Sequence, residues 1–342
     1  MEQPRVLRWF DVQSVPGDYR FPLEDRPGRL PIPLCDAVPV IDLHKSTTSP
    51  EKWSMVRQIV EASQEYGFFQ VINHGVSEDV VRETSTVFKE FFNMYAEGKK
   101  GTSASDGDLS RGWIYMNSSS VFAKDGIHLW RDNVKLACHP LEECMQGWPP
   151  KPTRYREVVA TYVEEMRRLS GRILELICEG LGLEAGYLER LSQVQLVVGN
   201  YYPPCPDPSL TLGLLKHCDP SLITILLQEG NACGLQVLHN GKWIGVAPLP
   251  NALVVNIGNQ LEIISNGKLK SAEHRAVTNS YEARISIATF INPSHNSIVE
   301  PAKVLVDELN PPRYAPTLYK DFAHTSKVAS TEATKPPAPL DS

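Results

Sequence analysis

Two histidines and one aspartate in the second half of the chain have the types and spacing of a metal-binding set. His217 and Asp219 stand two residues apart within an apolar stretch, and His274 follows further along the chain. Two imidazoles and one carboxylate can bind one face of an octahedral metal and leave three positions open. This ligand set suits non-haem Fe(II) used in oxygen chemistry. We therefore expect these three residues to be both the metal ligands and the catalytic centre.

An arginine and a serine beyond the second histidine offer a partner for an anion. Side chains alternate between the two faces of a strand, so the run from 284 to 292 would separate an aliphatic face from a mixed one. The mixed face holds Arg284, Ser286, Ala288, Phe290 and Asn292. A buried cation needs an anionic partner, and a guanidinium can grip a carboxylate with two hydrogen bonds. Arg284 is therefore our candidate for holding a dicarboxylate co-substrate.

A second polar face is predicted on the strand expected at 194–202. The same alternation puts Val198, Asn200 and Tyr202 on one side of it. Polar inner faces on several strands are unusual for a core and natural for a pocket in the mouth of a barrel. Each residue alone has a structural explanation, such as core packing for Tyr202. Their order along successive strands favours a functional interpretation for the whole set.

The composition is that of a globular protein with a sizeable core. Of 342 residues, 42% are hydrophobic and 22% charged, with a formal net charge of -6. This balance disfavours a general nucleic-acid or membrane surface. The N-terminus shows no apolar core of the kind expected in a signal peptide, and no apolar run is long enough to span a membrane. The seven cysteines include no Cys-x-x-Cys pair, so we expect free thiols and a cytoplasmic protein.

The chain divides into five regions by composition and pattern. We expect an extended arm at 1–38, a helix-rich region at 39–190, a β-rich core at 191–295, a C-terminal extension at 296–330 and a disordered tail at 331–342.

Hydrophobic periodicity predicts an α+β fold. Apolar positions at helical spacing indicate helices near 51–66, 78–95 and 153–181, with a long loop at 98–126 between the last two. Short β-rich runs separated by turn signals predict strands at 39–43, 68–72, 194–202, 222–228, 234–238, 242–246, 253–257, 262–265, 275–278 and 284–291. So many short strands after residue 193 favour a closed jelly roll buttressed by the helices.

These residues and their flanking motifs resemble one family, the plant soluble Fe(II)- and 2-oxoglutarate-dependent dioxygenases, whose fold is isopenicillin N synthase-like. The resemblance spans residues 37 to 325. Within the family, the chain is most similar to hyoscyamine 6β-hydroxylase-like and mugineic-acid dioxygenase-like members. Its markers are Pro39-Val-Ile-Asp-Leu, Gly67-Phe-Phe-Gln-Val-Ile-Asn-His-Gly, Asn200-Tyr-Tyr-Pro-Pro-Cys-Pro, His217-x-Asp219, His274-Arg and Arg284-x-Ser286.

The resemblance implies a double-stranded β-helix and a set of site residues. His217, Asp219 and His274 would bind Fe(II), and ascorbate would act as the reductant. Co-substrate binding would fall to Arg284, Ser286, Tyr202 and Asn200. Our candidates for the substrate wall are Phe290, Asn292, Val198, Phe122, His128 and Trp130.

The expected function is oxidation, most simply hydroxylation, of a small specialised metabolite such as an alkaloid or phenylpropanoid, with release of succinate and CO2. The partners would be this substrate and O2, and the enzyme would be a monomer. An iron oxidase of the same fold that does not use 2-oxoglutarate remains an alternative, as does a non-catalytic small-molecule binder. A zinc hydrolase has less support, because the His-Glu-x-x-His signature is absent. The sequence leaves the substrate and the outcome of the oxidation open.

Overall fold

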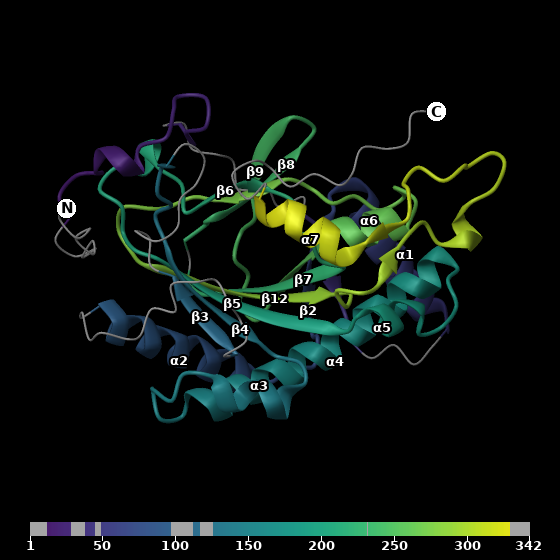
Figure 1. Cartoon of the computed structure of the whole chain (residues 1–342), viewed down its shortest axis with the longest axis horizontal. Coiled ribbons are helices and arrows are strands. Elements are labelled where there is room, and N and C mark those ends of the chain that lie inside the picture. Colours follow the sequence, from purple (N-terminus) through teal and green to yellow (C-terminus); the bar gives the residue numbers. More distant parts are fainter. Residues whose placement is uncertain are drawn as a thin grey trace.

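Two β-sheets form the centre of the molecule (Figure 1). The structure is a computed model that describes residues 12–28, 38–44, 49–96, 112–116, 126–230 and 232–328. The large sheet has the strand order β1-β2-β10-β7-β12-β5-β4-β3 and the small sheet the order β6-β11-β8-β9. This is the double-stranded β-helix with buttressing helices that the sequence predicted.

The strands of the large sheet are β1 (Val40–Asp42), β2 (Phe68–Ile72), β3 (Trp113–Met116), β4 (Asp132–Ala137), β5 (Val194–Tyr202), β7 (Ile223–Gln228), β10 (Leu253–Ile257) and β12 (Arg284–Asn292). Those of the small sheet are β6 (Leu214–His217), β8 (Leu235–His239), β9 (Lys242–Gly245) and β11 (His274–Ala276). A separate pair consists of β13 (Ile298–Val299) and β14 (Thr317–Leu318).

Strand β12 is the element that divides core from pocket. It pairs with β5 on one side and β7 on the other. Its odd-numbered isoleucines, Ile285, Ile287 and Ile291, belong to the main hydrophobic core. Because alternate residues point the opposite way, the even-numbered residues face the space between the two sheets, as the sequence predicted.

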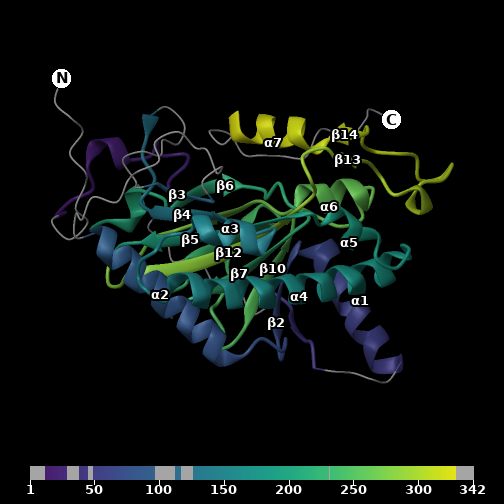
Figure 2. The same ribbon diagram turned by 60° about the horizontal axis from the view of Figure 1, so that its bottom comes forward.

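The helices are α1 (Ser49–Glu65), α2 (Glu78–Ala96), α3 (Leu141–Gly147), α4 (Tyr155–Leu181), α5 (Tyr187–Leu191), α6 (Asn259–Ile264) and α7 (Tyr319–Val328). Helices α2 and α4 lie against one side of the large sheet (Figures 1 and 2). The apolar face of α4 is buried in the main core and packs on α1 and α2. This layer of helices holds the aliphatic side of β12 away from water.

Two expectations about local structure were wrong. Residues 262–265 were expected as a strand but fall largely in α6, because a short apolar run does not distinguish the two states. Gly258 precedes α6 and lies so close to the Ser221 carbonyl that a Cβ could not fit. The loop expected at 98–126 contains β3, and the rest of that segment falls mostly outside the described residues, as does the tail at 331–342.

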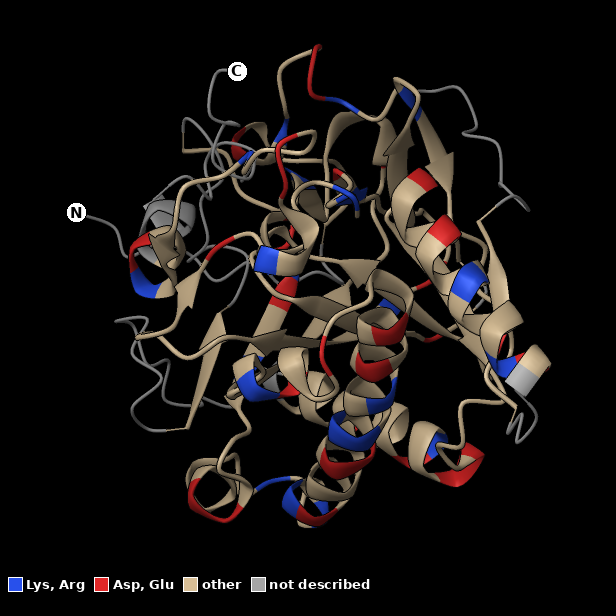
Figure 3. Cartoon of the chain, turned by 90° about the vertical axis from the view of Figure 1, so that its right-hand side faces the viewer, with Lys and Arg blue, Asp and Glu red and all other residues tan. Residues whose placement is uncertain are grey.

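Basic and acidic residues are mixed along the helices (Figure 3). None of the described helices combines the length and apolar character needed to cross a lipid bilayer.

Candidate active site

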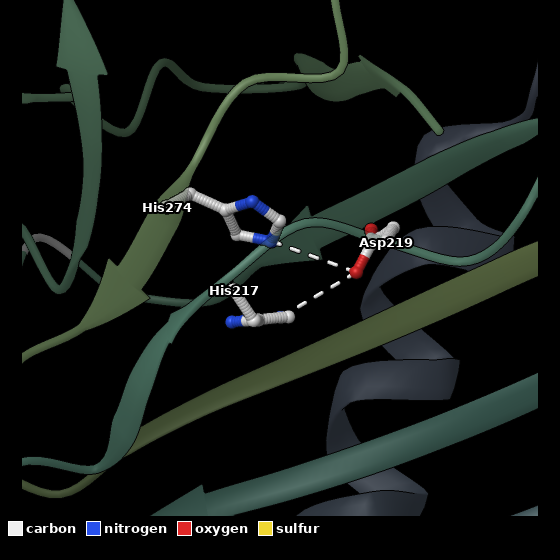
Figure 4. Close-up of side chains that lie close together, drawn as sticks. All are labelled: His217, Asp219 and His274. Carbon is white, nitrogen blue, oxygen red and sulfur yellow. Dashed lines mark ion pairs between the residues drawn. The ribbon is translucent and has the colours of Figure 1, made fainter. Parts of the chain in front are cut away.

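The pairing of two strands in the small sheet brings the two histidines together. β6 and β11 run antiparallel, and His217 and His274 are direct partners in their register. The centroids of the two rings lie 4.1 Å apart. Figure 4 shows both rings directed toward Asp219, which follows just after the end of β6. The local fold therefore assembles the three residues from separate parts of the chain.

Backbone carbonyls determine which nitrogen of each histidine ring is available to bind a metal. His217 Nδ1 lies 2.8 Å from the Leu215 carbonyl oxygen, and His274 Nδ1 lies 3.1 Å from the Ala272 carbonyl oxygen. A carbonyl only accepts hydrogen bonds, so in the neutral rings each Nδ1 carries the proton. The lone pair of each Nε2 is then directed at the centre of the site, as in histidines that bind metals.

The two oxygens of Asp219 have different surroundings. Oδ2 accepts hydrogen bonds from Thr224 Oγ1 at 2.6 Å and from Asn256 Nδ2 at 2.7 Å. Oδ1 instead lies 3.4 Å from His217 Nε2 and 3.6 Å from His274 Nε2. Thr224 and Asn256 thus hold the carboxylate in one orientation and leave Oδ1 as its outward donor.

The electrostatics of the site favour an ionised Asp219 beside a neutral His274. Burial opposes ionisation of Asp219, but the adjacent His274 and His217 and the Thr224 hydroxyl outweigh it and lower the pKa of this carboxyl from its usual range. Burial, reinforced by His217, lowers the pKa of His274 to about 4. Near neutral pH the site therefore offers one anionic oxygen and unprotonated nitrogen, the forms that bind metals.

The donor set fits a divalent transition metal. One ligand atom from each of the three residues lies within 4.8 Å of the others. Two imidazole nitrogens and one carboxylate oxygen on one face match the ligands of non-haem Fe(II) oxygenases. The edge of the Phe68 ring shields His274, with centroids 5.1 Å apart.

A pocket opens beside the three ligands and encloses about 570 Å³, its mouth included. Apart from the ligand residues, it is lined by Phe68, Arg131, Val198, Asn200, Tyr202, Leu214, Thr224, Leu226, Leu235, Asn256, Arg275, Ala276, Arg284, Ser286, Ala288 and Phe290.

Comparison with known proteins identifies the family and the fold. Residues 193–293 match the family model of the 2OG-Fe(II) oxygenase superfamily, and residues 38–154 match that of the non-haem dioxygenase in morphine synthesis N-terminal region. Hyoscyamine 6-dioxygenase of Hyoscyamus niger is 41% identical, and the alignment covers 93% of each chain. The chain belongs to the 2OG-Fe(II) oxygenase superfamily. It is a 2-oxoglutarate- and Fe(II)-dependent dioxygenase.

Other relatives of this dioxygenase support the same assignment. Mugineic-acid 3-dioxygenase of Hordeum vulgare is 40% identical over 94% of this chain and 92% of its own length. The crystal structure of JOX2 in complex with 2OG, Fe and JA superposes with a TM-score of 0.79 and 33% identity, covering 94% of this chain and 93% of that one. The fold class, the family and the enzyme class predicted from the sequence are confirmed.

The structure sorts the other predicted residues of the dioxygenase by position. It brings Arg284, Ser286, Tyr202 and Asn200 into the pocket wall together with Val198 and Phe290. Phe122 lies outside the described residues.

Three candidates for the substrate wall do not line the pocket of the dioxygenase. Asn292 lies at the far end of β12, where its Oδ1 accepts a hydrogen bond from Tyr319. Trp130 is fully buried, and its indole N–H donates to the Pro203 carbonyl oxygen. The His128 ring packs near the Tyr19 ring in a tilted arrangement, with ring centroids 5.0 Å apart. The partners of these three side chains lie outside the pocket lining.

Sequence reasoning missed several residues that the site of the dioxygenase uses. Thr224 and Asn256 are polar residues flanked on both sides by apolar residues of their strands, and that isolation was an available signal, since buried polar groups need partners. Arg131 lies directly before β4, a strand that the sequence analysis did not predict. The alternation of Val134 and Leu136 with polar neighbours was the only local sign of it.

The orientation of Asp219 leads to a first prediction. We expect Thr224→Val to lower the affinity of the dioxygenase for Fe(II) about tenfold, because lost outer hydrogen bonds to a ligand typically have effects of this order. Thr224→Ser keeps the hydroxyl and should bind within about threefold of the wild type. Anaerobic competition with a coloured chelator measures both. Equal affinity of the valine variant and the wild type would show that this hydrogen bond does not support the metal site.

Proposed function

We propose that this dioxygenase hydroxylates a small specialised metabolite, such as an alkaloid or phenylpropanoid. In this proposal His217, Asp219 and His274 bind the iron, and Arg284 and Ser286 bind the distal carboxylate of 2-oxoglutarate. Tyr202 and Asn200 would add hydrogen bonds to that co-substrate.

The observation that carries the proposal is the incomplete set of partners around Arg284. This guanidinium is 3% exposed, and its Nη2 donates to Gln228 Oε1 at 2.8 Å. Its Nε is buried without a hydrogen-bond partner, and no carboxylate of the described residues forms an ion pair with it. Burial lowers the pKa of Arg284 from its ordinary value, so the free protein holds a destabilised cation. A bound carboxylate would satisfy it.

A glycine makes room for this arginine and gives a second prediction. A Cβ at Gly234 would lie 2.7 Å from Arg284 Cδ and Nε, so Gly234→Ala must displace the guanidinium. We expect KM for 2-oxoglutarate to rise about tenfold with a smaller change in kcat, since small misplacements of a binding group are costly. Gly171→Ala, where nothing lies within 4 Å, is the matched control. An unchanged KM in Gly234→Ala would contradict this account of the co-substrate site.

The residues of the chain would position the reactants and exclude water. Bound iron supplies the activation of O2, coupled to decarboxylation of 2-oxoglutarate to succinate and CO2, and thereby the oxidation of a substrate C–H bond. The Nε2 atoms and Asp219 Oδ1 leave one side of the metal site open to ligands. Phe68, Leu226 and Phe290 supply an apolar wall for the body of the substrate.

The identity of the substrate is supported only at the level of its class. Relatives of similar identity are named for different substrates: a flavanone for the 41% identical Oryza sativa enzyme, and mugineic acid for the 40% identical Hordeum vulgare enzyme. A sequence identity of about 40% is therefore not enough to assign the substrate of a relative to this chain. The pocket combines apolar side chains with polar and charged groups, as small-molecule sites do.

Succinate release measured across a panel of plant metabolites tests the proposal. We expect at least one metabolite to increase succinate release in the presence of Fe(II) and 2-oxoglutarate and to gain one oxygen atom. Oxygen uptake that proceeds equally without 2-oxoglutarate would instead favour an oxidase of the same fold. Metal binding without succinate release on any substrate would favour a binding protein.

We also propose that the enzyme works as a cytoplasmic monomer with ascorbate as its external reductant. His217, Asp219, His274 and Arg284 belong to the same chain, so the proposed metal and co-substrate sites can be formed within one subunit. The described cysteines are free thiols, which fits a reducing compartment. Gel filtration and turnover with and without ascorbate test these points.

A further inference from the structure

We propose that Arg131 binds an anionic group of the oxidised substrate, which is therefore a small carboxylic acid. This inference rests on the proposed function, in which the same pocket holds Fe(II) and 2-oxoglutarate. It adds a specificity-determining residue and narrows the chemical class of the substrate.

The surroundings of Arg131 leave part of its guanidinium without a partner. The residue directly precedes β4, lines the pocket with the three ligand residues, and is partly exposed there. Its Nη1 donates to Asn200 Oδ1 at 3.1 Å, whereas its Nε is buried with no hydrogen-bond partner. No carboxylate in the described part of the chain forms an ion pair with it. A cation in this state favours an incoming anion.

The charges around the pocket leave Arg131 available after the co-substrate has bound. Among the described residues that line the pocket, Asp219 is the only acidic one, and Thr224 and Asn256 already engage one of its oxygens. The two positive charges of a divalent metal balance the two negative charges of a dicarboxylate. The arginines that line the pocket then carry more positive charge than Asp219 can neutralise. The pocket can therefore accept one more negative charge.

The other arginines of the pocket have different roles. Arg275 Nε donates to Gln236 Oε1 at 2.8 Å, its guanidinium lies over the Trp243 ring at 4.1 Å, and none of its nitrogens is buried without a partner. Arg284 lies on β12, and β5 separates β12 from β4 in the sheet. Two strand spacings amount to about 10 Å. Arg131 and Arg284 are thus placed to bind separate anions.

The remaining wall defines the body of the ligand. The small sheet contributes Leu214, Leu235 and Ala276, and β12 contributes Ala288 and Phe290. An apolar wall with a cation at one edge fits an amphipathic acid whose carboxylate reaches Arg131. The same cation disfavours a protonated amine, so among the proposed classes it favours phenylpropanoid-type acids over alkaloid bases.

Matched acids and amides test this inference. The probes are 3-phenylpropanoic, trans-cinnamic and 1-naphthaleneacetic acids, each with its primary amide. Calorimetry under nitrogen on protein loaded with Fe(II) and 2-oxoglutarate gives each dissociation constant. We expect at least one acid to bind about 10- to 100-fold more tightly than its amide, the range of a charge-assisted hydrogen bond. Arg131→Gln should bring that ratio close to one, and Arg131→Lys should keep most of it.

The outcomes separate this inference from the proposed function. The Fe(II)–2-oxoglutarate charge-transfer band should still form in Arg131→Gln, because Arg284 and Ser286 bind the co-substrate in the proposed function. Loss of the hydrogen bond to Asn200 should weaken the binding of 2-oxoglutarate much less than Arg284→Gln does. Equal binding of acids and amides by the wild type, or no binding of any acid, would overturn the inference alone. The inference would also be overturned if Arg131→Gln kept the preference for acids over amides. The same holds if this variant weakened only the binding of 2-oxoglutarate. Absence of the band in the wild type would overturn the proposed function and this inference with it.

Discussion

Replacing Asp219 by alanine is expected to abolish substrate-linked succinate formation and to lower Fe(II) affinity by more than about a hundredfold. Removing an outer partner of a ligand costs about 10- to 100-fold, and this change removes the only anionic ligand itself. It also leaves the Thr224 hydroxyl and the Asn256 amide without the oxygen that they share. Chelator competition and succinate release measure the two effects.

The control for this variant is a substitution of an acidic residue that lies near the metal site in the sequence but is not one of its ligands. Glu273 is adjacent to His274 but is not among the clustered ligand residues. Glu273→Gln should retain Fe(II) binding and turnover within about twofold. Circular dichroism of both variants checks that the fold is intact. Turnover of Asp219→Ala at the wild-type level would remove this carboxylate from the metal site.

Replacing Arg284 by glutamine is expected to raise the dissociation constant for 2-oxoglutarate about a hundredfold. Truncating one partner of a buried, hydrogen-bonded charge pair typically costs several kcal/mol, much of it because the other charge is left unpaired. Arg284→Lys keeps the charge but not the two-pronged geometry, so we expect an intermediate loss of about tenfold. Anaerobic titration of the Fe(II)-loaded variants gives these constants.

The pattern across the two arginines is more informative than either variant alone. Arg284→Gln should weaken the binding of 2-oxoglutarate and leave unchanged the preference of the substrate site for acids over amides. Arg131→Gln should remove that preference and affect the binding of 2-oxoglutarate much less. A dissociation constant for 2-oxoglutarate within threefold of wild type in Arg284→Gln would contradict the proposed co-substrate site.

Strand alternation explains why much of the pocket could be predicted from sequence. The pairing of β12 with β5 places Arg284 opposite Tyr202, Ser286 opposite Asn200 and Ala288 opposite Val198. All six line the pocket, because a period of two fixes the face of each residue once the strand is assigned. The same regularity could not tell where along the strand the pocket ends. Asn292 shares the face of Arg284 but lies beyond the pocket under Tyr319.

Contacts between distant segments were beyond sequence reasoning. The hydrogen bond from Asn256 to Asp219 joins residues 37 positions apart, and that from Arg131 to Asn200 joins residues 69 apart. No local periodicity encodes such pairs, which depend on the order of strands in the sheet. The helix α6 was also misassigned, because its short apolar segment is consistent with either state until tertiary packing decides.

The central claim is that the three clustered ligands and Arg284 jointly bind Fe(II) and 2-oxoglutarate. Visible absorbance of the anaerobic protein, titrated first with Fe(II) and then with 2-oxoglutarate, tests it most directly. We predict a weak metal-to-ligand charge-transfer band that requires both additions, is lost in Asp219→Ala, and needs much more 2-oxoglutarate in Arg284→Gln. Fe(II) binding with no band at any 2-oxoglutarate concentration would contradict the claim.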